Sequence, residues 1–379
     1  MSIPFIDLKA QRQRLGKRID DAILKVVNHG AYIMGPEIKE LETRLADFCG
    51  ARHCVSCANG TDALALVLMA WGIKPGDAVY VPAFTFVATA EVVAWFGATP
   101  VFVDVLEDTF NMDPASLETA IGAAADMNLT PRAVIPVDLF GQPADYRRLL
   151  PIAERHGLKV LADTAQGFGA TLDGQRTGTF GDATATSFFP AKPLSCYGDG
   201  GAIFTDDDAL ADDLHSLRVH GQGSDKYDNV RIGMNGRMDT IQAAVLIEKL
   251  EIFPDEIAAR QQVADYYASG LGPAYLPPAL MDGATSVWAQ YTIQVEDRGA
   301  VQAACKAAGV PTAVYYPIPL SRQTGYRHFP TVPGGIPVSD ALSERVISLP
   351  MHPYLDRETQ DRILAAVTSA GAVASAAAG

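Results

Sequence analysis

Residues 187–201 read S-F-F-P-A-K-P-L-S-C-Y-G-D-G-G, and two apolar runs flank them. The first run, at residues 183–189, and the second, at residues 202–205, have the composition of short buried strands. The prolines and glycines between them predict a loop, and Lys192 lies on it. A loop lysine is most often a solvated surface charge, so its role depends on what the other strand ends provide.

Three other segments place polar or aromatic groups at predicted strand ends. Residues 160–162 form a short apolar strand that is followed by Asp163 and T-A-Q-G-F-G, which contains Gln166. Residues 57–64, C-A-N-G-T-D-A-L, predict a strand end, a glycine turn and a helix start with Thr61 or Asp62 as N-cap. Such a helix start offers free N–H groups to a phosphate. Residues 82–89, P-A-F-T-F-V-A-T, can present an aromatic ring. Together these groups suit a lysine-bound pyridoxal 5'-phosphate.

Strands and helices alternate around these segments. Strands are predicted at residues 53–57, 78–81, 101–105, 133–137 and 159–162, and helices at 61–71, 89–96, 114–124 and 146–156. This alternation predicts an α/β fold with a mostly parallel sheet covered by helices on both faces. The strand at 202–205 follows too short a loop for a parallel crossover, so it is predicted to be antiparallel to the strand before it. One helix is expected at residues 11–30 and another at 37–49. Residues 220–239 are expected to form a binding loop.

Composition and charge exclude several classes of protein. The chain has 379 residues, of which 48% are hydrophobic and 20% charged, as in a soluble globular protein. It contains no run of eighteen apolar residues and no secretory leader, which predicts no membrane association and a cytoplasmic location. Thirty Lys and Arg against 44 Asp and Glu give a net charge of −14, which argues against binding to nucleic acid. The five cysteines are expected to be reduced and packed, with a redox or metal role as the alternative, and the histidines lack metal-ligand spacing.

The chain resembles a known family over nearly its whole length, from F-I-D-L near Phe5 to L-P-M-H-P-Y near Leu349. The motifs above are similar to those of the DegT/DnrJ/EryC1/StrS nucleotide-sugar aminotransferases. The resemblance implies fold type I of the pyridoxal-phosphate enzymes, like aspartate aminotransferase, with a mostly parallel seven-stranded sheet flanked by helices and a smaller C-terminal α/β domain. The expected division is an N-terminal arm and large coenzyme-binding domain at residues 1–270 and a small domain at 271–379. Close relatives usually have glycine at Ser195, which leaves one backbone angle of the Lys192 loop open.

The resemblance assigns the reacting groups to two residues. It implies that Lys192 bonds covalently to the coenzyme aldehyde and, when the amino donor displaces it, moves protons as an acid and base. Asp163 would pair with the pyridinium nitrogen, with a turn or helix cap as the alternative reading. Gln166 would hydrogen-bond the ring oxygen.

The resemblance also assigns residues that hold the coenzyme. The backbone N–H groups of Gly60 and Thr61, with Ser187, would bind the phosphate. Phe86 would stack on the ring, and ordinary core packing is the alternative. Asn235 matches an asparagine that reaches the phosphate of the other subunit in relatives, which implies a homodimer with shared active sites.

Three further residues are expected to meet the sugar. Arg237 matches an arginine that binds a sugar carboxylate in enzymes that act on glucuronate sugars, a task suited to its planar guanidinium group, and a surface arginine is the alternative. Tyr315 and Tyr316 align with residues lining the family's sugar pocket, although core packing is an equal alternative for one of them. No metal is predicted.

The motifs N-G-R-M-D-T-I-Q-A-A and S-F-F-P-A-K-P-L most resemble those of enzymes that aminate carbon 3 of UDP-2-acetamido-2-deoxy-3-oxo-D-glucuronate. We therefore expect a glutamate-dependent aminotransferase of surface-polysaccharide biosynthesis, such as that of lipopolysaccharide O-antigen. A TDP-linked 3-keto or 4-keto deoxyhexose is the alternative substrate. A sugar dehydratase of the same fold would have histidine in place of Lys192. A non-catalytic, coenzyme-binding regulatory module would be expected to carry a basic DNA-binding segment, which is absent.

Overall fold

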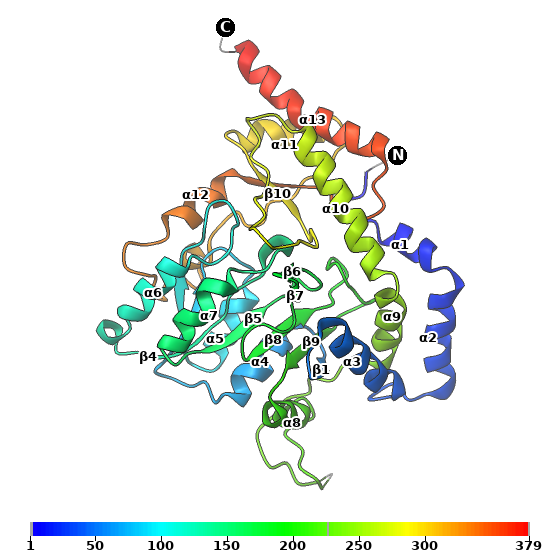
Figure 1. Ribbon diagram of the computed structural model, residues 1–379, viewed down its shortest axis with the longest axis vertical. Coiled ribbons are helices and arrows are strands. Elements are labelled where there is room, and N and C mark those ends of the chain that lie inside the picture. Colours follow the sequence, from blue (N-terminus) through cyan, green and yellow to red (C-terminus); the bar gives the residue numbers. More distant parts are fainter. Residues whose placement is uncertain (1–2, 226, 378–379) are drawn as a thin grey trace.

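A computed structural model describes residues 3–225 and 227–377 of the chain. A seven-stranded sheet forms its centre, helices cover both faces, and a second, two-stranded sheet lies toward the C-terminal end (Figure 1). This is the α/β fold class that the alternation of strands and helices predicted.

The helices and strands have the following bounds in chain order. The first half contains α1 (Leu8–Leu15), α2 (Lys17–His29), α3 (Pro36–Cys49), β1 (His53–Cys57), α4 (Gly60–Ala70), β2 (Asp77–Pro82), α5 (Ala88–Trp95), β3 (Thr99–Val103), α6 (Pro114–Gly122), β4 (Thr130–Val134), α7 (Tyr146–Arg155), β5 (Lys159–Asp163), β6 (Thr171–Leu172), β7 (Gln175–Arg176) and β8 (Ala183–Ser187). The second half contains β9 (Gly201–Thr205), α8 (Asp208–Leu217), α9 (Thr240–Leu250), α10 (Phe253–Gly270), β10 (Tyr291–Gln294), α11 (Arg298–Ala307), α12 (Pro337–Arg345), β11 (Val346–Leu349) and α13 (Arg357–Ala377). Short 3-10 helices lie at Ala125–Met127, Leu139–Gly141 and Leu320–Arg322.

The large sheet has the strand order β1-β9-β8-β5-β4-β2-β3. Strands β3, β2, β4, β5 and β8 pair in parallel, whereas β9 is antiparallel to both of its neighbours, β8 and β1. The antiparallel pairing of β8 and β9, with Ser187 opposite Gly201, confirms the prediction made from the short loop between them. The carboxyl ends of β1, β2, β5 and β8 therefore meet at one edge of the sheet, where open α/β sheets bind ligands.

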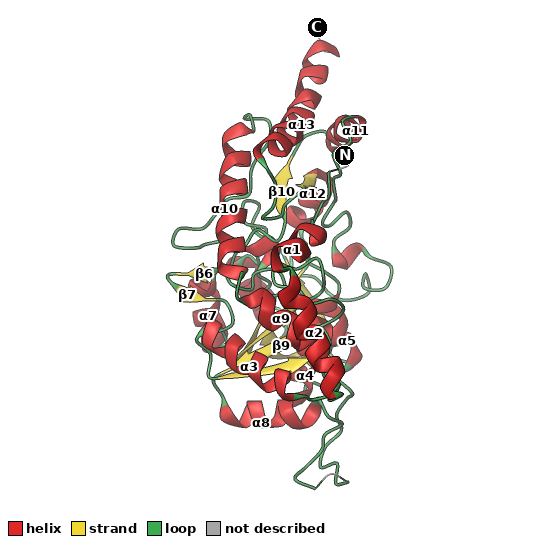
Figure 2. Cartoon of the chain, turned by 90° about the vertical axis from the view of Figure 1, so that its right-hand side faces the viewer, coloured by secondary structure: helices red, strands yellow, loops and turns green. Residues whose placement is uncertain are grey.

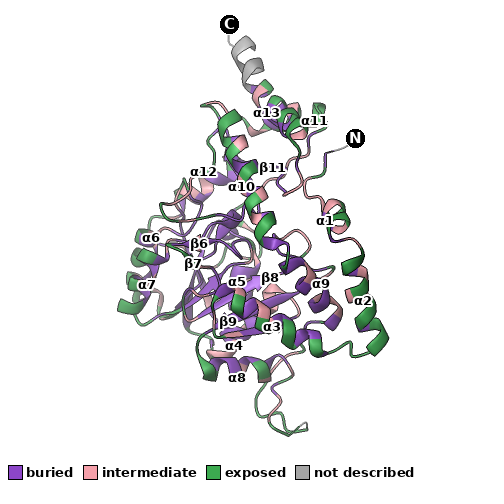
Figure 3. Cartoon of the chain, turned by 45° about the vertical axis from the view of Figure 1, so that its right-hand side comes forward, coloured by how far each residue is buried: buried purple, intermediate pink, exposed green. Residues whose placement is uncertain are grey.

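Two layers of apolar side chains enclose the sheet. Successive residues of β9 alternate between them, since Ala202 and Phe204 pack with α3 and α9 while Ile203 packs with α4 and α8. This alternation follows from the two-residue period of a strand. The central strands are consequently buried on both faces, and most exposed residues lie on the outer sides of the helices and in the loops (Figure 3).

The helix expected at residues 11–30 is wrong in one respect. The structure has two helices there, α1 and α2, which are separated by Gly16 at φ 56°. Because this φ lies in the left-handed region, which glycine adopts without a steric penalty, the glycine ends α1 and redirects the chain. The second predicted helix, at residues 37–49, is confirmed as α3.

The C-terminal part has a separate apolar cluster around the antiparallel pair β10 and β11. Side chains of α10, α11 and α13 complete this cluster, together with Ile3 from the amino terminus. Figures 1 and 2 show α10 running from the large sheet to this end of the molecule, beside α13. The division at residues 270 and 271 stays a prediction, because nothing independent defines a boundary there.

Two further expectations concern surfaces and thiols. No helix in residues 3–225 and 227–377 is long and apolar enough to cross a membrane. All five cysteines are buried and unpaired, and the described residues contain no group of ligands that could hold a metal.

The segment between α8 and α9 contains no regular helix or strand where the structure describes it, and it protrudes beside α8 (Figure 2).

Candidate active site

A cavity of about 640 Å3 opens at the edge of the sheet where the parallel strands end. It brings together side chains and backbone from all the segments that the sequence singled out, which are separated by more than 250 positions in the chain. Its wall includes every predicted site residue except Asn235 and Arg237: Gly60, Thr61, Phe86, Asp163, Gln166, Ser187, Lys192, Tyr315 and Tyr316.

Lys192 and Asp163 are two of the ionisable residues that line this cavity. Asp163 is the last residue of β5, and its carboxylate accepts hydrogen bonds from Thr89 Oγ1 at 3.0 Å and from the Ala165 N–H at 3.2 Å. Burial raises the pKa of Asp163, although these hydrogen bonds and the charge of Lys192 oppose the rise. Burial lowers the pKa of Lys192, and the nearby Asp163 opposes that shift. Lys192 is half-buried, and a lysine with a lowered pKa is a candidate nucleophile, because more of its amine is uncharged near neutral pH.

The amide of Gln166 is held on both sides. Its Oε1 accepts a hydrogen bond from the Phe140 N–H at 2.9 Å, and its Nε2 donates to the Tyr316 hydroxyl at 3.1 Å. Tyr316 is thereby joined to the end of β5 across 150 residues of sequence. The ring of Phe86 lies 6.4 Å from that of Tyr316 and is 54% exposed, so Phe86 is not a core residue.

The start of α4 lies directly against Ser187 at the end of β8. A Cβ atom at Gly60 would lie 2.6 Å from the Ser187 Cβ, so only glycine permits this approach. The first N–H groups of a helix have no acceptor within the helix, and here they face the cavity with the Ser187 side chain. The N-cap is Asn59, whose side chain accepts a hydrogen bond from the Asp62 N–H at 2.8 Å. The prediction of Thr61 or Asp62 as N-cap is therefore wrong.

Asn235 and Arg237 lie outside the cavity of their own chain. Between them, Gly236 donates to the Arg218 carbonyl at 3.0 Å and accepts from the Ala58 N–H at 2.9 Å, which fixes this segment against the end of β1. Asn235 is exposed and Arg237 is half-buried. The Arg237 Nε is buried and has no hydrogen-bond acceptor among the described residues. A single chain thus leaves the roles expected for both residues as predictions.

Several residues in or next to the cavity had no predicted role. Thr89 orients the Asp163 carboxylate, and Asn59, Trp95 and Gln290 line the wall. Thr89 lies three residues after Phe86, at the start of α5, and the quoted segment P-A-F-T-F-V-A-T contained it. The approach of Gln290 could not be read from the sequence, because it depends on a hydrogen bond from its N–H to the Phe140 carbonyl.

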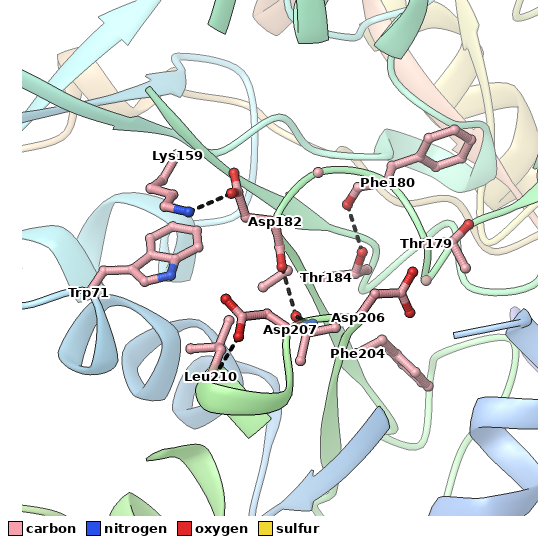
Figure 4. Close-up of a pocket in the computed structure, with 14 residues that line it drawn as sticks. Trp71, Lys159, Thr179, Phe180, Asp182, Thr184, Phe204, Asp206, Asp207 and Leu210 are labelled. Atoms are coloured by element: carbon pink, nitrogen blue, oxygen red, sulfur yellow. Dashed lines mark hydrogen bonds and ion pairs between the residues drawn. The ribbon is translucent and has the colours of Figure 1, made fainter. Parts of the chain in front are cut away.

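A second, smaller cavity of about 260 Å3 lies at the opposite edge of the sheet, where β5 and β8 begin (Figure 4). Its polar groups are engaged with one another. Lys159 Nζ is 2.7 Å from an Asp182 oxygen, and Asp207 accepts hydrogen bonds from the first turn of α8. We therefore assign reaction chemistry to the larger cavity.

Comparison with known proteins agrees with this geometry. A sequence profile described as the DegT/DnrJ/EryC1/StrS aminotransferase family matches residues 13–368. The chain belongs to this family. It is 51% identical, over 97% of its length and 100% of the relative, to a UDP-2-acetamido-2-deoxy-3-oxo-D-glucuronate aminotransferase of Pseudomonas aeruginosa. It is 38% identical, over 96% of its length and 95% of the relative, to a dTDP-3-amino-3,4,6-trideoxy-alpha-D-glucose transaminase of Streptomyces venezuelae.

Solved structures of the family have the same fold. An aminotransferase of the family from Brucella abortus superposes with a TM-score of 0.96 at 52% identity, covering 97% of this chain and 99% of that one. A sugar aminotransferase from Streptococcus pneumoniae, solved in its PLP-form, gives a TM-score of 0.87 at 28% identity, covering 98% and 100% of the two chains. These likenesses confirm the predicted fold class.

The residues of the larger cavity fit pyridoxal 5'-phosphate. Lys192 offers the amine, and Asp163 is a buried carboxylate at the same site. The start of α4 and the adjacent Ser187 both line the cavity, and the free N–H groups of a helix start suit a phosphate. This cavity therefore contains N–H donors that suit the phosphate and a carboxylate that suits the ring nitrogen.

Proposed function

We propose that this protein is a pyridoxal-phosphate-dependent aminotransferase that places an amino group on carbon 3 of UDP-2-acetamido-2-deoxy-3-oxo-D-glucuronate, with L-glutamate as the amino donor. The observation that carries the reaction class is the single cavity shared by Lys192, Asp163 and the start of α4. The substrate is supported by the 51% identity to the Pseudomonas aeruginosa enzyme over its full length.

Bound pyridoxal 5'-phosphate supplies the aldehyde that carries the amino group and a ring that accepts electrons. Lys192 would hold the coenzyme covalently and, once released, would transfer protons at the carbon that gains or loses the amine. Asp163, oriented by Thr89, keeps the ring nitrogen protonated. Gly60, Thr61 and Ser187 bind the phosphate.

The remaining residues of the site position the ring and the sugar. Phe86 would stack on the coenzyme ring, and Gln166, which Phe140 and Tyr316 hold in place, would hydrogen-bond the ring oxygen. Tyr315 and Tyr316 contact the sugar. Because three residues of the cavity wall, Gln290, Tyr315 and Tyr316, come from the C-terminal part of the chain, substrate binding depends on how that part packs on the large sheet.

The site is completed by a second copy of the chain. Asn235 and Arg237 lie outside their own cavity, and the Arg237 Nε lacks an acceptor among the described residues. In a homodimer Asn235 binds the coenzyme phosphate of the partner subunit, and Arg237 binds the sugar carboxylate there. Such an enzyme works in the cytoplasm, in the biosynthesis of surface polysaccharide.

The test is amination of a panel of UDP- and TDP-linked keto sugars by the purified protein with L-glutamate. NMR of the product should show the new amine on carbon 3 of the UDP-linked 3-oxo-glucuronate. Preferred turnover of a TDP-linked 3-keto or 4-keto deoxyhexose would instead establish the second candidate, which the similarity to the Streptomyces venezuelae transaminase favours.

A further inference from the structure

A buried lysine lies beneath the loop that carries Lys192. Lys249 is near the end of α9, is 1% exposed, and is surrounded by an apolar cluster that includes Leu246 and Leu250. Lysine is almost never fully buried unless it is paired, because the loss of hydration penalises its charge. We therefore expect the ammonium group of Lys249 to have a polar or charged partner.

The contacts of Lys249 go to the Lys192 loop. Its Nζ donates a hydrogen bond to Ser195 Oγ at 3.2 Å and lies 4.5 Å from the centre of the Tyr197 ring. It forms no ion pair with any residue that the structure describes, and the carboxylate of nearby Glu256 accepts hydrogen bonds from Gln11 and Tyr354 instead. Burial lowers the pKa of Lys249 to about 8, with Cys196 and Glu256 opposing the shift.

The same face of α9 makes a second attachment to the loop. Gln242 lies seven residues before Lys249, which is two helical turns and hence the same side of the helix. Its Oε1 accepts from the Tyr197 N–H at 2.8 Å, and its Nε2 donates to the Tyr197 carbonyl at 3.4 Å. One helix face thus holds residues 195–197, directly after Lys192.

Ser195 fits this arrangement without backbone strain. It is 1% exposed, and it does not belong to the non-glycine residues with positive φ, so glycine is not required at this position. This settles the backbone angle that the sequence left open. Its side chain provides what glycine cannot, an oxygen acceptor for a buried ammonium group.

We propose that Ser195 and Lys249 are a positioning pair that fixes the Lys192 loop on α9 and so sets the location of the Lys192 amine. The inference rests on the proposed role of Lys192 in the aminotransferase. The helix begins three residues after Arg237, so the same rigid element joins the loop that carries Lys192 to the segment offered to the partner subunit. Neither positioning residue contacts the reacting atoms.

The test compares Ser195→Ala, Lys249→Met and the double variant Ser195→Ala/Lys249→Met. Ser195→Ala leaves the buried ammonium group of Lys249 without its acceptor, whereas the double variant removes both groups. A buried charge that has lost its partner lowers the stability of a protein more than the loss of both partners does. We expect Ser195→Ala to lower kcat about tenfold with KM for L-glutamate within about twofold, and to speed coenzyme dissociation by a similar factor. The double variant should melt at a higher temperature than Ser195→Ala, because it leaves no buried ammonium group without an acceptor, but its kcat should stay about as low, because the loop is still detached from α9.

Ser339→Ala is the matched control. The Ser339 hydroxyl is also buried and donates to a charged group, Asp104 Oδ1, at 2.6 Å, but it lies in α12 and outside the cavity. It should lower the melting temperature and leave kcat and coenzyme dissociation unchanged. The proposal would be overturned if Ser195→Ala changed only the melting temperature. It would also be overturned if the effects of the two single variants on kcat multiplied in the double variant, because the two residues would then act independently. Coenzyme dissociation and melting require no sugar, so an error in the proposed substrate would not affect these two readouts.

Discussion

Replacing Gly60 with alanine should weaken coenzyme binding through a steric effect that the structure allows us to size. The added Cβ would lie 2.6 Å from the Ser187 Cβ and 3.2 Å from its Cα, whereas ordinary contacts begin at 3.4 Å. The start of α4 and the end of β8 must therefore separate by about 0.8 Å, the difference between 3.4 and 2.6 Å. Overpacking of this kind costs about 1–3 kcal/mol. If the phosphate site bears the whole cost, affinity falls roughly 5- to 150-fold, at tenfold per 1.4 kcal/mol.

The measurement is the dissociation constant of pyridoxal 5'-phosphate, followed by visible absorbance, together with the urea midpoint of each protein. Gly122→Ala is the control, because Gly122 lies at the end of α6, has no atom within 4 Å of the added Cβ and does not adopt a positive φ. It should bind the coenzyme as wild type does and be no less stable. Unchanged coenzyme affinity of Gly60→Ala would refute the assignment of this junction as the phosphate site.

Four further outcomes are expected. Lys192→Ala should lose the visible absorbance of the bound coenzyme and all transamination; retained turnover would exclude Lys192 as the reacting amine. Asn235→Ala protein mixed with Lys192→Ala protein should regain activity, since each hybrid dimer contains one site without either lesion; no recovery despite proven subunit exchange would count against shared sites. Arg237→Ala should lower kcat/KM about 10- to 100-fold on the glucuronate sugar and little on a neutral keto sugar, because a charge-assisted hydrogen bond to the carboxylate is lost; equal losses on both sugars would show that Arg237 is structural. Burial lowers the pKa of His352 from 6.5 to about 4, so between these values the unfolded chain binds more protons and stability falls as the pH drops. Urea unfolding should show a loss of about 2 kcal/mol between pH 7 and pH 5 that His352→Gln lacks, and an equal loss in both proteins would contradict this account.

Much of the fold was readable because its strands are short, apolar and punctuated. The run before Asp163 and the runs on either side of Lys192 have the composition of buried strands, and all three form strands of the large sheet. The break at Gly16 was missed because the apolar residues on both sides keep the helical spacing, and only the backbone angle reveals the interruption. Strand β11 and helix α12 were missed because each is short and depends on tertiary packing.

The residues of the candidate site could be predicted where a sequence motif contains them. They could not be predicted where tertiary packing brings them to the site. Lys192, Asp163 and Gln166 lie in recognisable segments at strand ends, so their convergence follows from a parallel sheet. Thr89 reaches Asp163, and Gln290 reaches the cavity wall, through contacts between distant elements, which no local pattern encodes. Asn235 and Arg237 lie outside the cavity of their own chain, so the roles proposed for them stay predictions.

The buried thiols offer built-in reporters of local opening. Cys196 lies in the Lys192 loop, Cys305 in α11, and Cys49 and Cys54 at the junction of α3 and β1, and burial raises the pKa of each. A thiol-specific reagent can reach them only when the surrounding structure opens, so each labelling rate measures the free energy of opening one region of the native protein. Mass spectrometry of the labelled peptides, with and without coenzyme, would show which part of the molecule the coenzyme tightens.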